Sequence, residues 1–400
     1  MAPEASREYE STHPWLTFDV RKQLAAAPPV LWQLTGKVVA LAQHLAESPM
    51  LPSYAERMHR VYLIKGVVAT TQIEGNTLSE DDVEQLLDKQ LELPISKQYL
   101  GVEVMNMIEI FSRIMSDLDR GKTLEVTPAV IKQHNQDVLK DLELEPGVVP
   151  GEVSDKGVVV GQYRGAPRRD CEFLLDQLCE WLENGVPASS DPTPMATSIL
   201  RALLAHLYLA WIHAFGDGNG RTARVVEFQI LASGGVPGPA AHLLSNHFND
   251  TRIEYYRQLT HASKSGGDVL PFLIYALQGF YDGLQTQLAE LREQSEELLW
   301  RELVDQAIPG HKVTDGRRRN LAIAMFKRRR GQPVRRAEMV DLTPSLVRAY
   351  GDPKSKTLSR DIGILMRLDL LRQEGKGGYR VAEERILGLM PMRARRPDDV

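Results

Sequence analysis

Cysteine is scarce in this chain of 400 residues, which contains only Cys171 and Cys179. The two lie eight residues apart in DCEFLLDQLCEWL, a segment whose apolar spacing is typical of a helix. At a rise of about 1.5 Å per residue their Cα atoms would lie about 12 Å apart, too far for a disulfide. We therefore expect reduced thiols and a cytoplasmic protein.

Long apolar runs are also missing. No run of successive apolar residues reaches the roughly 18 residues typical of a membrane-spanning helix. The first residues, MAPEASREYESTHPWLTF, lack the basic start and apolar core of a secretory signal. We expect no membrane partner.

An excess of positive charge is absent as well. Lys and Arg number 48 against 53 Asp and Glu, which gives a net charge of −5. This balance argues against a surface that coats nucleic acid, although an acidic average can hide a local basic segment. With 43% hydrophobic and 25% charged residues, the composition is that of a globular protein, long enough for two or three domains.

Strand signals are few, and we predict a mainly α fold. Apolar residues recur three and four positions apart, as on helices, in 54–71, 79–93, 99–118, 127–141, 171–183, 195–214, 222–233, 249–263 and 269–303. One β-branched run flanked by glycines, KGVVVGQYRGAP at 156–167, predicts a hairpin or flap between two helices.

The C-terminal quarter has a different composition. A linker is expected at 307–316, followed by the densely basic segment 312–336. An amphipathic helix over 357–373 and a glycine turn into a strand over 374–381 then complete the order of a winged helix-turn-helix. The last residues, 393–400, are expected to be a frayed tail.

Such a domain could contact DNA phosphates through Arg360 and Arg367 on its second helix and through Lys376 and Arg380 in the wing. Many winged helices serve instead in protein contact or dimerisation. We favour protein contact, because the rest of the chain is acidic.

The stretch WIHAFGDGNGRTARVVEFQIL, residues 211–231, interrupts two apolar helical segments with glycines and charges. Gly218, Asn219 and Gly220 fall where the second helix begins. Free backbone N–H groups and the positive end of the helix dipole make such a place an anion site. Arg221 and Arg224 oppose that dipole in the first turn, unless a polyanion lies above them.

Other loops that bind phosphates or ions do not fit this stretch. It has no GK[ST] ending of a P-loop, and no strand precedes the glycines as in a dinucleotide-binding turn. An EF-hand fails because its fifth position would be Arg221 and its twelfth Phe228.

The segment HAFGDGNGRTAR, residues 213–224, resembles the Fic-domain signature H-x-F-x-[DE]-G-N-G-R-x-x-R at every defined position, with Ala214 where many members have proline. The resemblance implies transfer of AMP from ATP to a protein hydroxyl, with release of pyrophosphate. His213 would be the general base, Phe215 would anchor the loop in the core, and Asp217 would hold Mg²⁺.

The same resemblance implies that Gly218, Asn219 and Gly220 form an anion hole. Arg221 would meet the β-phosphate of ATP and Arg224 the γ-phosphate. Taken singly, each of these residues also suits an ordinary structural role, as a core histidine, a turn residue or a solvated arginine. Their joint spacing favours the functional interpretation.

A second resemblance lies upstream, in VVATTQIEGNTLSEDD. Glu74 is expected at the end of a helix, with Gly75 or Asn76 as its cap and Ser79 at the start of the next helix. Thr70-x-x-x-Glu74-Gly75 resembles the inhibitory motif [ST]-x-x-x-E-[GN] of Fic proteins. This implies that Glu74 pairs with Arg224 in place of the γ-phosphate. An exposed glutamate at a helix end is the alternative.

Two further patterns concern a flap and a base pocket. Val159, Val160 and Gly161 are expected to clamp the target by strand-like backbone pairing. IEYYRQLTHAS resembles the adenine-side helix of the family, which would place Tyr256 and Leu259 near the base, with Ser263 where some relatives carry asparagine. Tyr255 and Tyr256 also suit the role of core aromatics.

Taken together, the sequence predicts a Fic-type helical bundle with a small β-hairpin flap and a C-terminal winged helix-turn-helix domain. The expected parts are an N-terminal extension, a helical region with the inhibitory helix, the catalytic core, a connecting helix with linker, a winged-helix-like domain and a tail, at 1–50, 51–125, 126–285, 286–310, 311–385 and 386–400.

The expected activity is that of an autoinhibited protein adenylyltransferase that uses ATP and Mg²⁺. It would modify the Ser, Thr or Tyr hydroxyl of a protein target, itself included. Removal of AMP from modified proteins and nucleotide sensing by a DNA-binding regulator are the alternatives. The target, the use of other nucleotides and a homodimer are left open by the sequence.

Overall fold

The computed structural model describes residues 7–160, 163–184, 194–328, 333–375 and 377–387. The described chain is mainly helical, as predicted, with two small antiparallel sheets. It divides into two compact units, residues 1–288 and 289–400. The finer domain boundaries expected from the sequence stay predictions.

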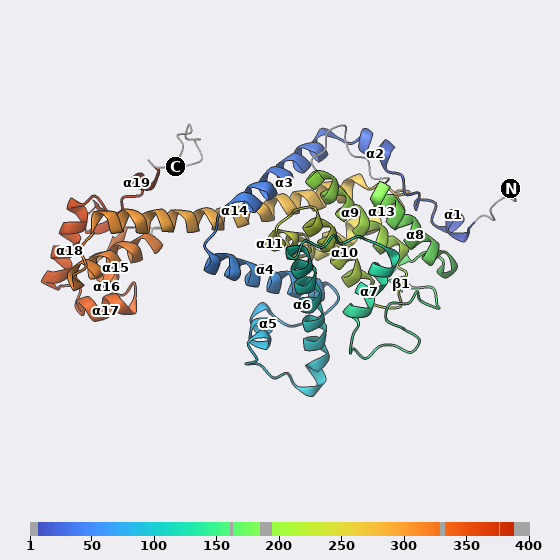
Figure 1. The fold of residues 1–400 in the computed structure, drawn as a ribbon, viewed down its shortest axis with the longest axis horizontal. Coiled ribbons are helices and arrows are strands. Elements are labelled where there is room, and N and C mark those ends of the chain that lie inside the picture. The colour runs from blue at the N-terminus through green and yellow to red at the C-terminus, as the bar shows by residue number, and fades with distance from the viewer. Residues whose placement is uncertain (1–6, 161–162, 185–193, 329–332, 376, 388–400) are drawn as a thin grey trace. The chain divides into compact units, whose positions relative to one another are not determined.

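The first unit is built from helices and one hairpin (Figure 1). Its elements are α1 (Glu8–Thr12), α2 (Arg21–Ala25), α3 (Pro29–Glu47), α4 (Pro52–Ile73), α5 (Glu80–Leu87), a 3₁₀ turn (Ile95–Lys97), α6 (Gln98–Asp119), α7 (Pro128–Val138), β1 (Val159–Val160), β2 (Tyr163–Arg164), α8 (Arg168–Asn184), α9 (Pro194–Ile212), α10 (Asn219–Ser233), α11 (Gly238–Ala241), α12 (Leu243–Asp250), α13 (Arg252–Lys264) and the first part of α14 (Leu270–Ala307).

Helices α9 and α10 form the centre of this unit. They pack against each other, and α4, α6 and α7 pack around α10, while α3, α8 and α13 contact α9. Helix α9 is long and apolar enough to cross a membrane, yet 78% of that apolar window is buried inside the protein. A helix that is apolar on all sides is expected at the core of a bundle of this size.

Helix α3 was missed by the sequence analysis, which treated residues 1–50 as an extension. Its buried face consists of apolar residues at helical spacing, including Leu31, Leu34, Val38, Ala42 and Leu45. This periodicity was a usable signal. The N-terminal extension therefore contributes to the core of the first unit.

Two predicted helices differ from the observed ones. The segment 249–263 belongs to two helices, α12 and α13, which are separated at Thr251. The Thr251 hydroxyl donates to the carbonyl of His247 at 2.6 Å, at the end of α12. The helix expected over 79–93 ends at Leu87, and Lys89 has the left-handed φ of 56°.

The predicted hairpin is present. Strand β1 pairs antiparallel with β2, with Val159 opposite Arg164 and Val160 opposite Tyr163. Gly161, the third residue expected to dock the target, lies outside the described residues. The docking role of Val159 and Val160 stays a prediction.

The second unit contains the end of α14, α15 (Val313–Lys327), β3 (Val334–Arg335), α16 (Arg336–Val340), α17 (Pro344–Tyr350), α18 (Lys356–Arg367), β4 (Leu371–Glu374), β5 (Gly378–Val381) and α19 (Glu384–Leu387). The strand order is β3-β5-β4, all antiparallel. Helices followed by a hairpin match the predicted order, and assignment to the winged-helix class stays a prediction.

Two boundaries in this unit correct the sequence analysis. The helix expected over 357–373 ends at Arg367, because Asp369 takes a left-handed φ of 55° and the chain then enters β4. The linker is shorter than the expected 307–316, since only residues 308–312 lie between α14 and α15. Lys376 and the tail 393–400 lie outside the described residues.

Much of the basic segment is neutralised within this unit. Arg317 and Arg318 donate through their Nε atoms to the two oxygens of Asp361, at 2.7 and 2.8 Å, and the Tyr350 hydroxyl adds a bond at 3.1 Å. Asp361 is fully buried. Its pKa lies below the ordinary range because these bonds outweigh the opposing effect of burial.

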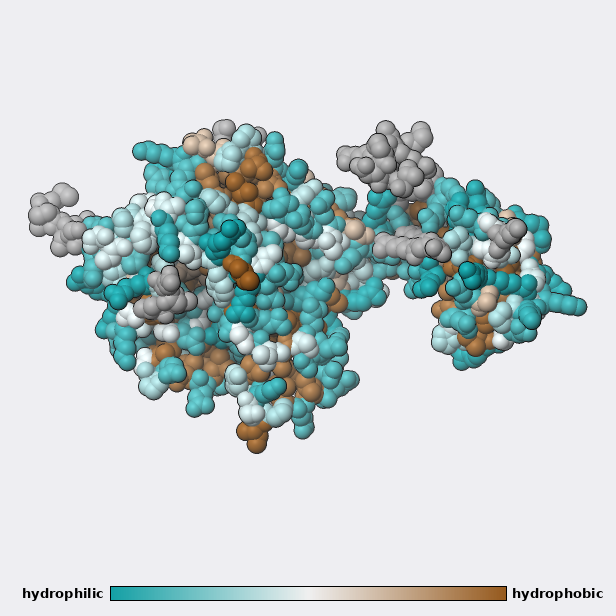
Figure 2. All heavy atoms as spheres, turned by 180° about the vertical axis from the view of Figure 1, so that it is seen from behind, coloured by the Kyte–Doolittle hydropathy of each residue, from teal (hydrophilic) through white to brown (hydrophobic). Residues whose placement is uncertain are grey.

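Hydrophobic side chains on the surface are scattered. Figure 2 shows them as separate brown patches among hydrophilic residues on one face. The most exposed are Ile95, Val313 and Ile253, each close to 90% exposed and far apart in the sequence. Single exposed hydrophobic residues of this kind are ordinary and indicate no interface by themselves.

The Asp361 cluster gives a stability prediction. Asp361→Ala leaves two arginines without their shared carboxylate, and we expect a loss of about 3 kcal/mol in the stability of the second unit. Hydrogen exchange of peptides from 313–367 in the full chain measures it. Glu374→Ala, which removes the half-exposed partner of Arg380, should cost less than about 1 kcal/mol. Equal losses in the two variants would contradict the role of the cluster.

Candidate functional site

The loop between α9 and α10 has a fixed backbone. His213 takes a left-handed φ of 50°, which is rare for a residue with a side chain, and Gly218 takes φ 75° at the N-cap of α10. Phe215 is buried and pairs with Val153 in an isolated β-bridge. Unusual backbone angles that persist in a well-packed loop often mark functional sites.

The side chain of Asn219 closes this loop. Its Oδ1 accepts from the backbone N–H of Phe215 at 2.9 Å, and its Nδ2 donates to the carbonyl of Phe215 at 2.7 Å. Asn219 is buried. The sequence resemblance places Asn219 in the anion hole, whereas in the structure its side chain holds the loop together. Any contact with an anion would therefore come from its backbone.

The hairpin lies directly beside His213. The N–H of Ala166 donates to the carbonyl of Ile212 at 3.0 Å, and that of Ser154 donates to the carbonyl of Ala214 at 2.8 Å. A Cβ on Gly165 would lie 2.9 Å from the Cβ of His213, so this close approach requires glycine. The flap is thus anchored on both sides of the histidine.

The environment of His213 suits a base. Its Nδ1 lies 3.3 Å from the carbonyl of Ala210, which assigns the proton to Nδ1 and leaves the lone pair on Nε2. Burial lowers the pKa of His213, although the nearby carboxylates of Glu74 and Asp217 oppose the shift. The neutral form is therefore present at neutral pH.

The N-terminus of α10 is covered by the carboxylate of Glu74. This residue caps the C-terminal end of α4, where Gly75 takes φ 104° and allows the chain to turn. A Cβ on Gly220 would lie only 2.1 Å from Oε1 of Glu74. Glycine at 220 therefore lets a carboxylate approach the positive end of the α10 dipole.

Glu74 also pairs with Arg224, as the sequence resemblance implied. Arg224 Nη2 donates to Oε1 of Glu74 at 2.5 Å and to the carbonyl of Thr70 at 3.0 Å. The Arg224 side chain is 0% exposed, whereas Glu74 keeps 31%. Burial favours the neutral form of Glu74, but the charge of Arg224 outweighs it, and the pKa of Glu74 is lowered.

Arg221 holds different partners from Arg224. Its Nη1 donates to Oε1 of Glu103 at 2.5 Å, and its Nη2 donates to Oδ1 of Asp217 at 2.9 Å. The sequence analysis missed Glu103. A usable signal existed, because Glu103 is a carboxylate on the apolar face of α6, between Leu100 and Val104.

Asp217 presents one carboxylate to the solvent side of the loop. Its side chain is 50% exposed, and Oδ1 also accepts from the N–H of Gly218 at 2.5 Å. Among the described residues, no group of three or more His, Cys, Asp or Glu side chains could hold a metal. A single carboxylate completed by phosphate oxygens and water is nevertheless the usual protein share of a Mg²⁺ site.

The two residues expected near the base lie on α13, three positions apart. The Tyr256 hydroxyl donates to the carbonyl of Ile73 at 3.1 Å, directly before Glu74, and the ring remains 40% exposed. Leu259 is partly exposed. Tyr255 is a core aromatic, 3% exposed, with its hydroxyl 2.8 Å from His206. Their role toward a base stays a prediction.

Ser263, which stands where some relatives carry asparagine, is buried. Its hydroxyl donates to the carbonyl of Thr260 at 3.0 Å within the same helix. The bond is local and holds the hydroxyl against its own helix. Ser263 is therefore poorly placed to replace an asparagine as a ligand of the base.

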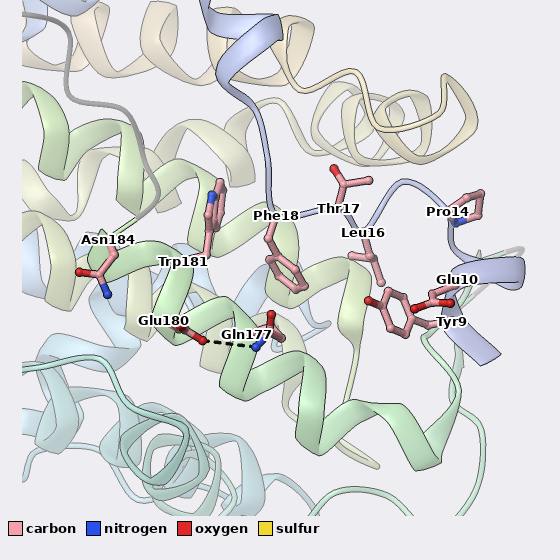
Figure 3. A pocket seen from close by; sticks show the side chains of 10 residues that line it. All are labelled: Tyr9, Glu10, Pro14, Leu16, Thr17, Phe18, Gln177, Glu180, Trp181 and Asn184. Carbon is pink, nitrogen blue, oxygen red and sulfur yellow. Dashed lines mark hydrogen bonds between the residues drawn. The ribbon is translucent and has the colours of Figure 1, made fainter. Parts of the chain in front are cut away.

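A pocket of about 620 Å³ lies away from this loop, between the N-terminal segment and α8 (Figure 3). It is lined by Tyr9, Glu10, Pro14, Leu16, Thr17, Phe18, Gln177, Glu180, Trp181 and Asn184. None of residues 213–224 lines it. The same segment reaches the flap through His13, whose Nε2 lies 2.9 Å from the carbonyl of Arg164.

The contact at Gly220 gives a testable prediction. Gly220→Ala places a methyl group against the Glu74 carboxylate, and we expect a loss of about 1–2 kcal/mol in the free energy of unfolding. In a Glu74→Gly background the same substitution should cost much less. Thermal unfolding of the four proteins measures this coupling.

Gly216→Ala serves as the matched control for that cycle. Its Cβ would meet Val148 at 2.9 Å and not Glu74, so its cost should be the same in both backgrounds. A Gly220→Ala cost that is unchanged when Glu74 is removed would contradict the observed contact.

Comparison with known proteins agrees with this geometry. Residues 125–231 match the family described as Fic/DOC. The chain is 29% identical over 256 residues to protein adenylyltransferase fic-1 of Caenorhabditis briggsae and 28% identical over 259 residues to that of Caenorhabditis elegans. These matches cover 63% and 64% of this chain, but only 46% of each relative.

Solved structures show the same fold. Fic-1 (residues 134–508) from C. elegans superposes with a TM-score of 0.54 at 24% identity, over 68% of this chain and 75% of that one. A Fic family protein from Desulfovibrio desulfuricans G20 superposes with a TM-score of 0.53 at 19% identity, over 88% and 96%. The matched family and the signature at 213–224, which lies within the match, place a Fic domain at residues 125–231 of this chain.

Proposed function

We propose that this protein is an autoinhibited protein adenylyltransferase. It would transfer AMP from ATP to a Ser, Thr or Tyr hydroxyl of a protein, itself included. The observation that carries the proposal is the Glu74 carboxylate, which lies against Gly220 and pairs with the buried Arg224. A carboxylate at a glycine-lined helix N-terminus marks the place of an anionic substrate group.

The loop offers the groups that such a transfer needs. The hydroxyl oxygen of the target attacks the α-phosphorus of ATP, and Nε2 of His213 takes its proton. The bond from the α-phosphorus to the bridging oxygen breaks, and pyrophosphate leaves with its electron pair. The backbone N–H groups of Asn219 and Gly220 and the guanidinium of Arg221 would face the developing charge on the phosphates, whereas the N–H of Gly218 donates to Asp217.

Asp217 is the residue that would hold Mg²⁺ in this proposal. The bound ion would neutralise charge on the α- and β-phosphates. The support is chemical, because Asp217 is half exposed beside the anion site and Mg²⁺ prefers carboxylate and phosphate oxygens.

Glu74 acts as the brake in this proposal. With its carboxylate on Arg224, the γ-phosphate of ATP loses its partner and the triphosphate is bound in an unproductive pose. The position of Glu74 at the end of α4 supports this role, because a carboxylate at the C-terminal end of a helix is favourable only with a cation beside it, and Arg224 is that cation.

The proposal extends to the target, the base, the C-terminal unit and the location of the protein. Val159 and Val160 of the flap would dock the target by backbone pairing beside His213. Tyr256 and Leu259 would flank the adenine. The C-terminal unit would contact protein in preference to DNA, since Arg317, Arg318 and Arg380 are already paired with carboxylates. We propose a cytoplasmic location on the basis of cysteine usage.

Labelling with α-³²P-ATP and Mg²⁺ tests the central proposal. Glu74→Gly protein should label itself or a lysate protein, because Arg224 becomes free for the γ-phosphate. The unmodified protein should give at least tenfold less label, and the Glu74→Gly, His213→Ala double mutant none.

Each result of this experiment has a defined meaning. If Glu74→Gly protein binds ATP yet is labelled no faster than the unmodified protein, autoinhibition by Glu74 is excluded. Absence of label from every sample would exclude the transferase and favour hydrolysis of AMP from modified proteins, or nucleotide sensing.

The pKa of His213 predicts the pH dependence. Since burial lowers this pKa below its usual 6.5, the rate of AMP transfer should fall only when the pH drops below that value. Loss of Glu74 removes a negative charge that raises the pKa, so Glu74→Gly moves the acid limb lower still. The pH dependence of kcat/KM for ATP between pH 5 and 9 measures it, because kcat/KM reports the pKa of the free protein. An acid limb above 6.5 would contradict His213 as a buried base.

A further inference from the structure

Glu103 is a buried carboxylate that the transfer reaction described above does not use. It lies on α6 and is 7% exposed. Both of its oxygens have partners, Oε1 with Arg221 Nη1 at 2.5 Å and Oε2 with Asn76 Nδ2 at 2.8 Å. It thus joins three segments that are far apart in the sequence.

Core packing alone gives no reason for a carboxylate at this position. The neighbouring residues on this face of α6 are apolar, including Leu100, Val104 and Met107. A buried ion pair contributes little net stability compared with apolar residues of the same volume, because desolvation offsets the attraction. The buried position of Glu103 is therefore explained by the residues that it binds, and not by stability of the core.

Arg221 is held from two sides by unequal partners. Asp217, on one side, is 50% exposed and can turn toward solvent or a cation. The Glu103 side chain, on the other, is only 9% exposed and is fixed by its second bond to Asn76. Glu103 is therefore the partner that can keep Arg221 in place when the surroundings of Asp217 change.

The same carboxylate also holds the turn that carries Glu74. Asn76 follows Glu74 by two residues, and its Nδ2 donates to Glu103 and to the carbonyl of Leu100 at 3.1 Å. Its Oδ1 accepts from the N–H of Leu78 at 3.0 Å. The turn after α4 is thereby tied to α6 at Glu103.

We propose that Glu103 is a positioning residue that holds Arg221 toward the nucleotide phosphates and ties it to the turn of Glu74. The inference rests on the proposed function, in which Arg221 contacts the β-phosphate. It predicts that, in protein without Glu74, Glu103 affects AMP transfer only through Arg221, and this distinguishes it from a residue that merely supports the fold.

A double-mutant cycle in the Glu74→Gly background tests the inference. Glu103→Gln should lower kcat/KM for ATP by roughly 10- to 100-fold, the usual effect of losing the partner of a ligand-binding group. With Arg221→Gln already present, Glu103→Gln should cost less than about twofold. Glu109→Gln is the control, since it removes a carboxylate from the same helix whose partner Lys140 is exposed, and it should leave both backgrounds unchanged.

Folding is measured on the same proteins by thermal unfolding. If Glu103→Gln does not fold, Asn76→Ala takes its place, because it removes the second bond of Glu103 and leaves the carboxylate. Asn76→Ala should lower kcat/KM only while Arg221 is present. An equal loss with and without Arg221, for either variant, would overturn the inference.

Binding of ATP, measured by calorimetry, separates this inference from the proposed function. If Glu74→Gly protein binds ATP and transfers no AMP, the proposed function fails. The coupling between Glu103 and Arg221 is then measured from the Kd values for ATP of the same variants. If transfer occurs and the effects of Glu103 and Arg221 are additive, only the inference fails. If ATP binds to none of the variants, both fail.

Discussion

The buried guanidinium of Arg224 is the constraint on which the rest of the site depends. Its side chain is 0% exposed, so it requires an anionic partner inside the protein. Here that partner is Glu74, which lies at the end of α4 and reaches Arg224 because Gly220 has no side chain in the way. A nucleotide that entered the proposed site would meet a guanidinium whose charge is already paired through Nη2, while its Nε and Nη1 have no hydrogen-bond partner among the described residues. Autoinhibition, in this account, follows from the need to neutralise a buried charge.

The chemistry-bearing loop could be predicted from the sequence because its residues are contiguous. The spacing from His213 to Arg224 and the glycines at the start of α10 predict an anion site without knowledge of the fold. The pairing of Glu74 with Arg224, 150 residues apart, was implied by the resemblance of a short motif and is present in the structure. The apolar period likewise predicted helices over 195–214 and 222–233, close to the observed α9 and α10.

Other features depend on tertiary contacts that no local pattern specifies. The side chain of Asn219 binds the backbone of Phe215 and closes the loop. Glu103 contacts Arg221 only because α6 packs on α10. The sequence shows that the segment 312–336 is densely basic, but not that Asp361 on a later helix neutralises two of its arginines. Helix α3 was missed despite its apolar period, because an N-terminal extension was assumed. The predicted helix ends were wrong where residues with a left-handed φ, such as Asp369, change the direction of the chain.

The affinities for ATP and ADP test the central claim most directly, because the two nucleotides differ in the γ-phosphate that Glu74 is thought to replace. Calorimetry with the unmodified protein should give nearly equal Kd values, since Arg224 is already occupied. Glu74→Gly protein should bind ATP at least tenfold more tightly than ADP. Equal affinities in both proteins would contradict the account, because Arg224 would then not be the partner of the γ-phosphate.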